Sequence, residues 1–290
     1  MFNMTQSDLA QAVESFALLA QNLRDEDLDR PWDWHGHNEG ARFLFFRVYE
    51  ELRALQTQVF TRRISQGLPL NSAQELLASQ HQAYWQLQAV LLNGTAPYFD
   101  QAPSPGEWAI RETLRHIIRT EQVFVALVHY HLDLERRGVS PAFDETRAFL
   151  KEYRAQFDHQ HQVTMQSSLE DILALFSEIH YHGLADLCQL SDQQLDLPSF
   201  FWEPQPFPIR SRLGRMDSHV RQHTIQIEKT LAALQIQPSE TQRLLAMVYS
   251  AVAGLEAVSL GAESVEVAGR EQTTLRIAEA TEALAVVITQ

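Results

Sequence analysis

The chain has 290 residues, 45% of them hydrophobic and 21% charged, a globular composition with material for one large domain or two small ones. Its formal net charge of −14 argues against nucleic acid or an anionic membrane surface as the main partner, because both need a basic footprint. The single cysteine, Cys188, excludes a disulfide within the chain and a zinc site built from cysteines.

Helical periodicity runs through almost the whole chain, whereas alternating strand patterns are scarce. Thr5 or Ser7 is expected to cap the first helix, and Ser168 to start the fifth. The region 139–166 is expected to be partly helical. The expected helices cover about residues 5–23, 38–65, 73–93, 108–137, 169–190, 209–235, 239–260 and 270–289.

Two segments rich in turn residues interrupt this helical pattern. The first, "GTAPYFDQAPSPGEW" at 94–108, holds three prolines and two glycines and is expected to be a loop. The second, "LDLPSFFWEPQPFPIRS" at 195–211, holds four prolines and three other aromatic residues around Trp202. Proline and aromatic residues in this density predict a packed loop rather than a helix or strand.

The order of these elements predicts an all-α protein. Residues 71–236 contain four principal helices with one long connection between the second and third, which is enough for a four-helix bundle with a crossover. Residues 1–70 and 237–290 add about four further helices as N- and C-terminal extensions. These extensions either pack together as a second, degenerate bundle or wrap the first.

The segment "RMDSHVRQHTIQIEKTL", residues 215–231, places two histidines four residues apart on one side of a helix. His223 falls within the apolar seam of this helix, and His219 lies one turn before it. A pair with this spacing can direct two imidazoles at one metal ion. The alternative is two half-buried histidines that are hydrogen-bonded to their neighbours.

A third histidine, His116, lies in "GEWAIRETLRHIIRTE" at 106–121, two helical turns beyond Trp108. Periodicity alone does not make it a ligand. However, this phrase, followed about a hundred residues later by the histidine pair, resembles the DinB-like family of damage-inducible four-helix bundle proteins. The resemblance covers about residues 71–236 and implies that His116, His219 and His223 are metal ligands.

Three neutral imidazoles with an open fourth position are typical of a catalytic metal site rather than a structural one. A divalent metal is therefore expected, zinc or nickel first, while the ligand type also allows iron or manganese. The family includes thiol-dependent transferases, so the resemblance implies a low-molecular-weight thiol as co-substrate. No catalytic residue beyond the three ligands is predicted.

Metal-bound histidines usually have their second ring nitrogen fixed by an acceptor. Glu112, one turn before His116, and Glu121 are the candidates for this role. A solvated Glu112, and a Glu121 paired with an arginine, are the alternatives. Arg221 and Gln222 are weaker candidates for the mouth of the site.

Two further features allow more than one interpretation. Trp202 and its neighbours form either an aromatic lid over the metal or, as we prefer, a plug at the end of the bundle. When Glu51 is set against Glu121, the segment around Phe46 is similar to the start of another second bundle helix, with phenylalanine in the place of His116. A duplicated unit without a site would have this pattern, and so would chance.

These observations favour a metal-dependent enzyme that transfers a thiol such as bacillithiol, mycothiol or glutathione to an electrophile. The alternatives are a metal-dependent hydrolase and a non-enzymatic stress-response scaffold with a structural or vestigial metal. A small-molecule substrate is expected, without nucleic acid, and the helical extensions would allow a homodimer.

The N-terminal phrase "MFNMTQSDLAQAVESF" lacks the basic region, apolar run and cleavage site of a signal peptide. In addition, no stretch approaches the roughly 18 apolar residues that a membrane span needs. The protein is therefore expected to be cytoplasmic, without a membrane partner.

Overall fold

The computed structural model describes residues 8–34, 36–92, 98–164, 166–262, 265 and 269–289. This part of the chain is almost entirely helical, so the predicted all-α class is confirmed. No helix within it is long and apolar enough to cross a membrane. The helices are α1 Asp8–Ala20, α2 Arg42–Ser65, α3 Ser72–Leu91, α4 Ile110–Arg136, α5 Phe143–Thr164, α6 Leu169–Leu187, α7 Asp192–Leu195, α8 Ile209–Ala233, α9 Glu240–Ser259 and α10 Gly269–Thr289.

The helix starts follow local capping chemistry where the sequence provides it. Ser168 caps α6 as predicted, because its side chain accepts a hydrogen bond from the backbone N–H of Asp171. The predicted caps Thr5 and Ser7 lie outside the described residues. The region 139–166, expected to be partly helical, contains one 22-residue helix, α5.

The start of the second helix was predicted wrongly. Residues 38–40 belong to a strand, β2 (His37–Gly40), which pairs antiparallel with β1 (Pro31–Trp34), and α2 begins only at Arg42. Two glycines explain the difference. Gly36 has a φ of +82°, which suits the turn between the strands, and a Cβ at Gly40 would come within 3.0 Å of the carbonyl oxygen of Leu28.

The proline-rich segment after α7 is a short hairpin of β3 (Pro198–Ser199) and β4 (Phe207–Pro208). Arg212, buried at the start of α8, donates to both the hydroxyl and the carbonyl oxygen of Ser199. His131 on α4 accepts the backbone N–H of Phe200 at 3.1 Å. These two side chains fix the hairpin against the helices.

The described residues fall into two compact units. The first, here called the histidine unit, lies within Asn71–Gln80 and Ala96–Thr230. The second, here called the terminal unit, lies within Gln6–Leu70, His81–Thr95 and Leu231–Gln290, so that residues of α3 occur in both. This division differs from the predicted segments 1–70, 71–236 and 237–290, whose boundaries stay predictions.

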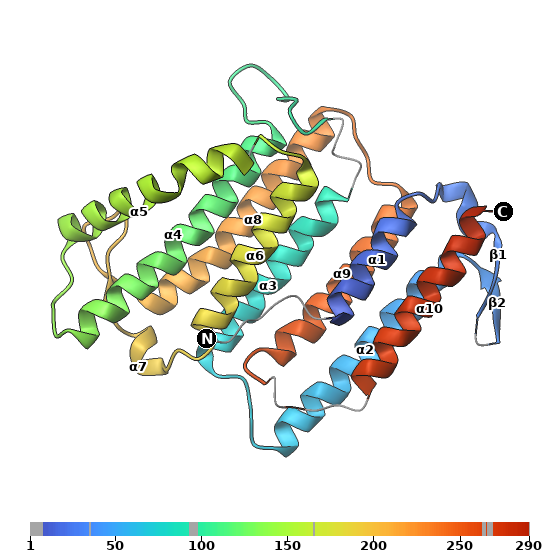
Figure 1. The fold of residues 1–290 in the computed structure, drawn as a ribbon, viewed down its shortest axis with the longest axis horizontal. Helices are drawn as coiled ribbons and strands as arrows, with labels where there is room; N and C mark the ends of the chain where they lie inside the picture. Colours follow the sequence, from blue (N-terminus) through green and yellow to red (C-terminus); the bar gives the residue numbers. More distant parts are fainter. Residues whose placement is uncertain are drawn as a thin grey trace. The chain divides into compact units, whose positions relative to one another are not determined.

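The histidine unit is built on α3, α4, α6 and α8, with α5 beside α4 (Figure 1). A mixture of hydrogen bonds and apolar contacts links each of these four helices to the next. Its contacts are Gln74 to Cys188, Glu121 to His180, Phe124 to Met216, and Arg221 to Ser79. Since α5 lies in the connection between α4 and α6, this is the predicted bundle with a crossover.

In the described part of the terminal unit, α1, α2, α9 and α10 form a second bundle. Its α2 packs on α9 and α10, and α1 packs on the same two helices. Phe16 of α1 and Phe45 of α2 meet edge to face in its core, with ring centroids 5.3 Å apart. The helices from the two ends of the chain therefore pack on one another.

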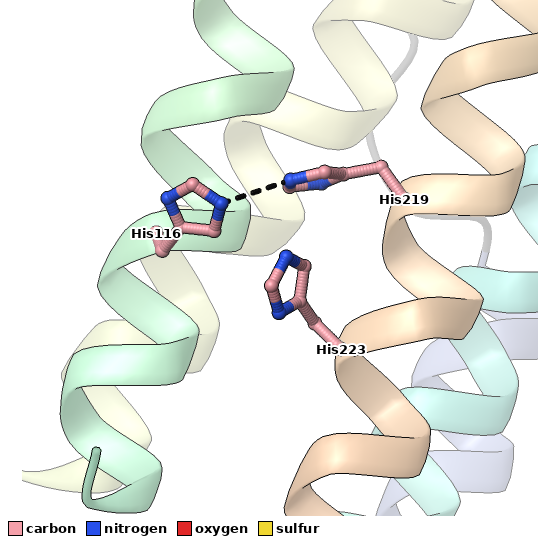
Figure 2. Close-up of side chains that lie close together, drawn as sticks. All are labelled: His116, His219 and His223. Carbon is pink, nitrogen blue, oxygen red and sulfur yellow. Dashed lines mark hydrogen bonds between the residues drawn. The ribbon is translucent and has the colours of Figure 1, made fainter. Parts of the chain in front are cut away.

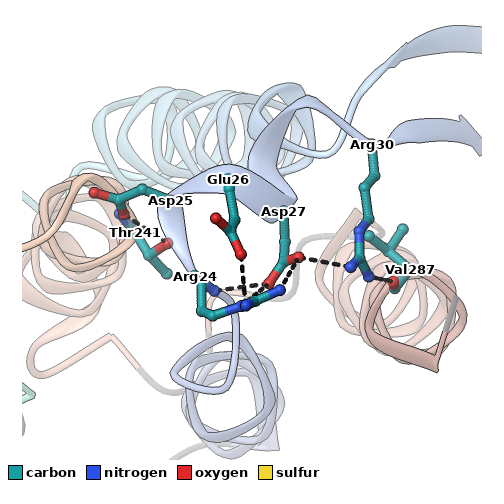
Figure 3. A network of polar contacts seen from close by, with 7 residues as sticks. All are labelled: Arg24, Asp25, Glu26, Asp27, Arg30, Thr241 and Val287. Carbon is teal, nitrogen blue, oxygen red and sulfur yellow. Dashed lines mark hydrogen bonds and ion pairs between the residues drawn. The ribbon is translucent and has the colours of Figure 1, made fainter.

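A 3₁₀ turn, η1 (Asp25–Asp29), and the arginine that follows it contact the start of α9 and the end of α10 in the terminal unit (Figure 3). Asp25 accepts the first backbone N–H groups of α9, from Glu240 and Thr241. Asp27 pairs with Arg24 and Arg30, and Arg30 also donates to the carbonyl oxygen of Val287 near the end of α10. The carboxylate of Asp25 therefore accepts from the free N–H groups at the start of α9, and the guanidinium of Arg30 donates to a free carbonyl group at the end of α10.

Candidate metal centre

Two neighbouring helices position the three predicted histidines. His219 and His223 continue the buried stripe of α8, and each side chain is only 7% exposed. His116 is half-buried on the facing side of α4. The seam of α8 that brings them there consists of Ile209, Leu213, Met216, Val220, Ile227 and Leu231, all buried.

The three imidazoles converge on one point between the helices (Figure 2). The Nε2 atoms of His116 and His219 are 3.0 Å apart. The ring centroid of His223 lies 4.7 Å from that of His116 and 4.5 Å from that of His219. One nitrogen from each ring lies within 4.8 Å of the others, so the cluster can hold a metal ion.

The donor set fits a divalent transition metal. In a tetrahedral site with Zn–N bonds of about 2.0–2.1 Å, the ligand nitrogens are about 3.3 Å apart. The Nε2 atoms of His116 and His219, 3.0 Å apart, are close to this separation, and the nitrogen of His223 lies within 4.8 Å of both. The cluster consists of three imidazoles, and among the described residues no carboxylate joins it. Such a set suits zinc, nickel, copper or iron better than the hard cations calcium and magnesium.

The electrostatics favour neutral rings. Burial lowers the pKa of His219 to about 3, helped by the proximity of His223, His116 and Arg215. Burial also lowers the pKa of His116, with a smaller contribution from His223. For His223, burial outweighs the opposing hydrogen bond to Gln226 and lowers the pKa. Imidazoles with lowered pKa values are unprotonated at neutral pH, which is the state that binds a metal.

Gln226 contacts His223 from outside the cluster, and the sequence did not predict this contact. Its Oε1 lies 2.8 Å from the Nδ1 of His223. The signal was available, because a residue three positions further along a helix lies on the same face. The predicted acceptors, Glu112 and Glu121, lie on α4 instead.

The two predicted outer acceptors are bound elsewhere. Glu112 accepts the backbone N–H of Ala109 at 2.9 Å and so caps its own helix. Glu121 is buried and its Oε1 lies 2.7 Å from the Nδ1 of His180 on α6. Its Oε2 has no hydrogen-bond partner among the described residues. The prediction that these carboxylates fix the metal histidines is therefore corrected: one is needed by a helix start, the other by a buried histidine.

Trp108 forms an aromatic wall next to the cluster. Its ring centroid lies 5.3 Å from that of His116, and it stacks on His223 at 6.5 Å with an interplanar angle of 19°. The indole remains 42% exposed. It therefore covers one side of the histidines and still meets solvent.

Other residues considered from the sequence have different surroundings. Trp202 packs on Phe124 and Phe201 and is 58% exposed. Arg221 pairs with Asp217 on its own helix. In the terminal unit, Glu51 pairs with Arg276. These contacts give packing and ion-pair roles to Trp202, Arg221 and Glu51.

Comparison with known proteins identified one family. A family model described as "DinB superfamily" matches residues 79–227, just over half of the chain. The match spans α4 and most of α8 and includes all three histidines. No curated protein and no solved structure matches the chain.

Proposed function

This chain belongs to the DinB superfamily, and on that premise we propose that it is a metal-dependent enzyme whose ligands are His116, His219 and His223. The observation that carries the proposal is the convergence of three imidazoles, one nitrogen from each within 4.8 Å of the others, with pKa values that burial has lowered. Zinc or nickel is the metal that we expect first.

Each residue around the cluster has a distinct role in this proposal. Gln226 accepts a hydrogen bond from Nδ1–H of His223, which leaves the Nε2 lone pair of that ring for the metal. Trp108 shields the rings on one side and limits the approach of substrate to the remaining side. A metal bound by three protein ligands has an open position that can hold a thiolate and favour its formation at neutral pH.

We propose that the reaction is transfer of a low-molecular-weight thiol to an electrophile. A metal held by the three histidines would lower the pKa of a thiol bound to it, so that the thiol proton would pass to solvent without a protein base. The thiolate sulfur would then form the new bond to the electrophilic carbon as the leaving group, chloride for example, departs to solvent. Glu112 and Glu121 are hydrogen-bonded to Ala109 and His180, and no other carboxylate among the described residues joins the cluster, which counts against the hydrolase alternative.

The first test is elemental analysis of the full chain, purified without a metal-binding tag. We expect about one metal ion per chain in the wild type and none in the double variant His219→Ala/His223→Ala. The matched control is His129→Ala/His182→Ala, which removes two exposed histidines that both approach Asp186. It should retain the metal. Equal metal content in the two double variants would refute the site.

The second test addresses the reaction. Metal-loaded wild type is mixed with 1-chloro-2,4-dinitrobenzene and with bacillithiol or glutathione, and loss of free thiol is followed. We expect turnover that is abolished in His219→Ala/His223→Ala and unchanged in His129→Ala/His182→Ala. Hydrolysis of ester substrates without added thiol, together with no thiol consumption, would instead support the hydrolase.

A further inference from the structure

The arginines of α8 differ in how they are paired. Three of them form ion pairs with carboxylates: Arg210 with Asp196, Arg212 with Glu203, and Arg221 with Asp217. The fourth, Arg215, has neutral partners. Its Nη1 and Nη2 atoms donate to the Ser218 hydroxyl and to the Gln222 amide oxygen, each at 3.2 Å. Within the described part of the chain, its positive charge therefore has no carboxylate counterpart.

Arg215 lies next to the three histidines. It precedes His219 by four residues, so the two side chains share a face of α8. Its positive charge lowers the pKa of both His219 and His223. Trp108 stacks on His223, which lies one turn after His219. Along α8, the candidate metal centre is therefore placed between an indole and a guanidinium.

An unpaired guanidinium in this position is suited to an anion. The chain has a formal net charge of −14, and the other three arginines of α8 each pair with a carboxylate, so Arg215 differs from its neighbours on this helix. A guanidinium has five N–H donors in a planar fork that matches a carboxylate. Ser218 and Gln222 use only two of these donors and hold the side chain along the helix. The group is thus oriented in advance and half-buried, with capacity left for a ligand.

We propose that Arg215 is a specificity-determining residue that binds a carboxylate of the thiol co-substrate while the sulfur of that thiol lies at the histidine cluster. The inference rests on the proposed function and adds to it the chemical class of the thiol. A thiol with a carboxylate a few bonds from its sulfur is bound at two points. A neutral thiol is bound at one.

The test uses cobalt(II)-loaded full-length protein, because binding of a thiolate to cobalt gives a near-ultraviolet charge-transfer band. The two probes are 3-mercaptopropionate and its methyl ester, which share the thiol and differ in the carboxylate. We expect Arg215→Gln to weaken binding of the acid by about tenfold, the loss of one charge-assisted contact at a half-buried site. Its affinity for the ester should stay within about twofold.

Two further variants make the result specific. Arg210→Gln removes a positive charge from the same helix, at a residue paired with Asp196, and should leave both affinities unchanged. Arg215→Lys keeps the charge but not the fork, so its affinity for the acid should be intermediate. If Arg215→Gln does not fold or load cobalt, the lysine variant is used instead. An affinity of Arg215→Lys for the acid equal to that of the wild type would then refute a role for the guanidinium fork.

Failure of this inference differs from failure of the proposed function. Suppose that the wild type loads cobalt and binds both probes. If Arg215→Gln then weakens binding of the acid and of the ester by the same factor, or weakens binding of neither, the role of Arg215 is refuted and the metal site stands. If the wild type loads no cobalt, the proposed function fails and this inference fails with it. Metal content is measured on every sample to separate these results.

Discussion

The Nδ1 atom of His223 lies 2.8 Å from the Oε1 atom of Gln226, three residues further along α8. Because an amide oxygen only accepts, the hydrogen resides on Nδ1 and the lone pair on Nε2. This hydrogen bond selects the tautomer in which Nε2 of His223 is free to bind a metal. Loss of such a contact typically weakens metal binding by about 10- to 100-fold.

We therefore expect Gln226→Leu, which keeps the size of the side chain but removes the acceptor, to weaken metal binding by about 10- to 100-fold. Gln226→Glu keeps an acceptor at the same position and should bind at least as tightly as the wild type. Affinities are measured by competition with a chromophoric chelator at pH 7.5. A leucine variant with wild-type affinity would show that the tautomer is set without Gln226.

Metal binding should be insensitive to pH down to slightly acidic values. The pKa values of all three histidines are lowered from 6.5, that of His219 to about 3. Protons compete with the metal only when pH falls below the pKa of a ligand. Affinity should therefore be nearly constant from about pH 8 to 6.5 and decline below that. The same chelator competition, repeated over this range, would contradict the prediction if affinity fell steadily from pH 8.

The sequence predicted the parts of the site that depend on one helix. The spacing of His219 and His223 determines that both lie on one face of α8, whatever the helix packs against. His116 was predicted as the third ligand from the resemblance of the segment 106–121 to the DinB-like family. Periodicity within α4 does not show which helix the His116 side chain faces. The three histidines lie together in one cluster, and their role as metal ligands stays a prediction.

Contacts between helices could not be predicted in this way. The pairing of Glu121 with His180 joins residues 59 positions apart, and it depends on how α4 and α6 are rotated against each other. The hairpin before α2 was missed for another reason. Helical periodicity begins at about residue 42 and does not show that Gly40 ends a strand, because the close approach of Gly40 to the carbonyl oxygen of Leu28 is a tertiary contact.

Glu121 should contribute to folding rather than to metal binding. Its side chain and that of His180 are both buried, 2.7 Å apart. Leaving a buried polar group without its hydrogen-bond partner typically costs about 1–3 kcal/mol. We expect a loss of this order in Glu121→Ala, and about 1 kcal/mol in Glu121→Gln, which keeps the accepting oxygen.

The free energy of unfolding in urea checks these values, and chelator competition on Glu121→Gln checks the site. Its metal affinity should equal that of the wild type. A tenfold weaker affinity without loss of stability would restore Glu121 as an outer residue of the metal centre.

His131 should make the hairpin after α7 sensitive to acid. Its Nδ1–H donates to the carbonyl oxygen of Leu127 at 2.9 Å, and its Nε2 accepts the N–H of Phe200 at 3.1 Å. Protonation of Nε2 would abolish that second bond. Burial lowers the pKa of His131, which outweighs the opposite effect of its bond to Leu127, and the charge of Arg212 lowers the pKa further.

The sign of the pH dependence follows from this lowered pKa. Above about pH 6.5 the histidine is neutral in both the folded and unfolded states, and the folded state has its full stability. As pH falls below 6.5, the unfolded chain takes up a proton first, so stability decreases until the lower pKa of the folded state is reached. The decrease approaches about 1.4 kcal/mol per pH unit for one proton.

His131→Gln isolates this contribution, because glutamine can accept the N–H of Phe200 but does not titrate. Metal-loaded wild type and variant are unfolded in urea at pH 8, 6.5, 6 and 5.5, since bound metal keeps the three histidines of the cluster unprotonated and the remaining histidines titrate alike in both proteins. The variant should lose less stability between pH 6.5 and 5.5 than the wild type. Parallel losses in both proteins would show that Nε2 of His131 does not govern the acid response, and that another group holds the hairpin as pH falls.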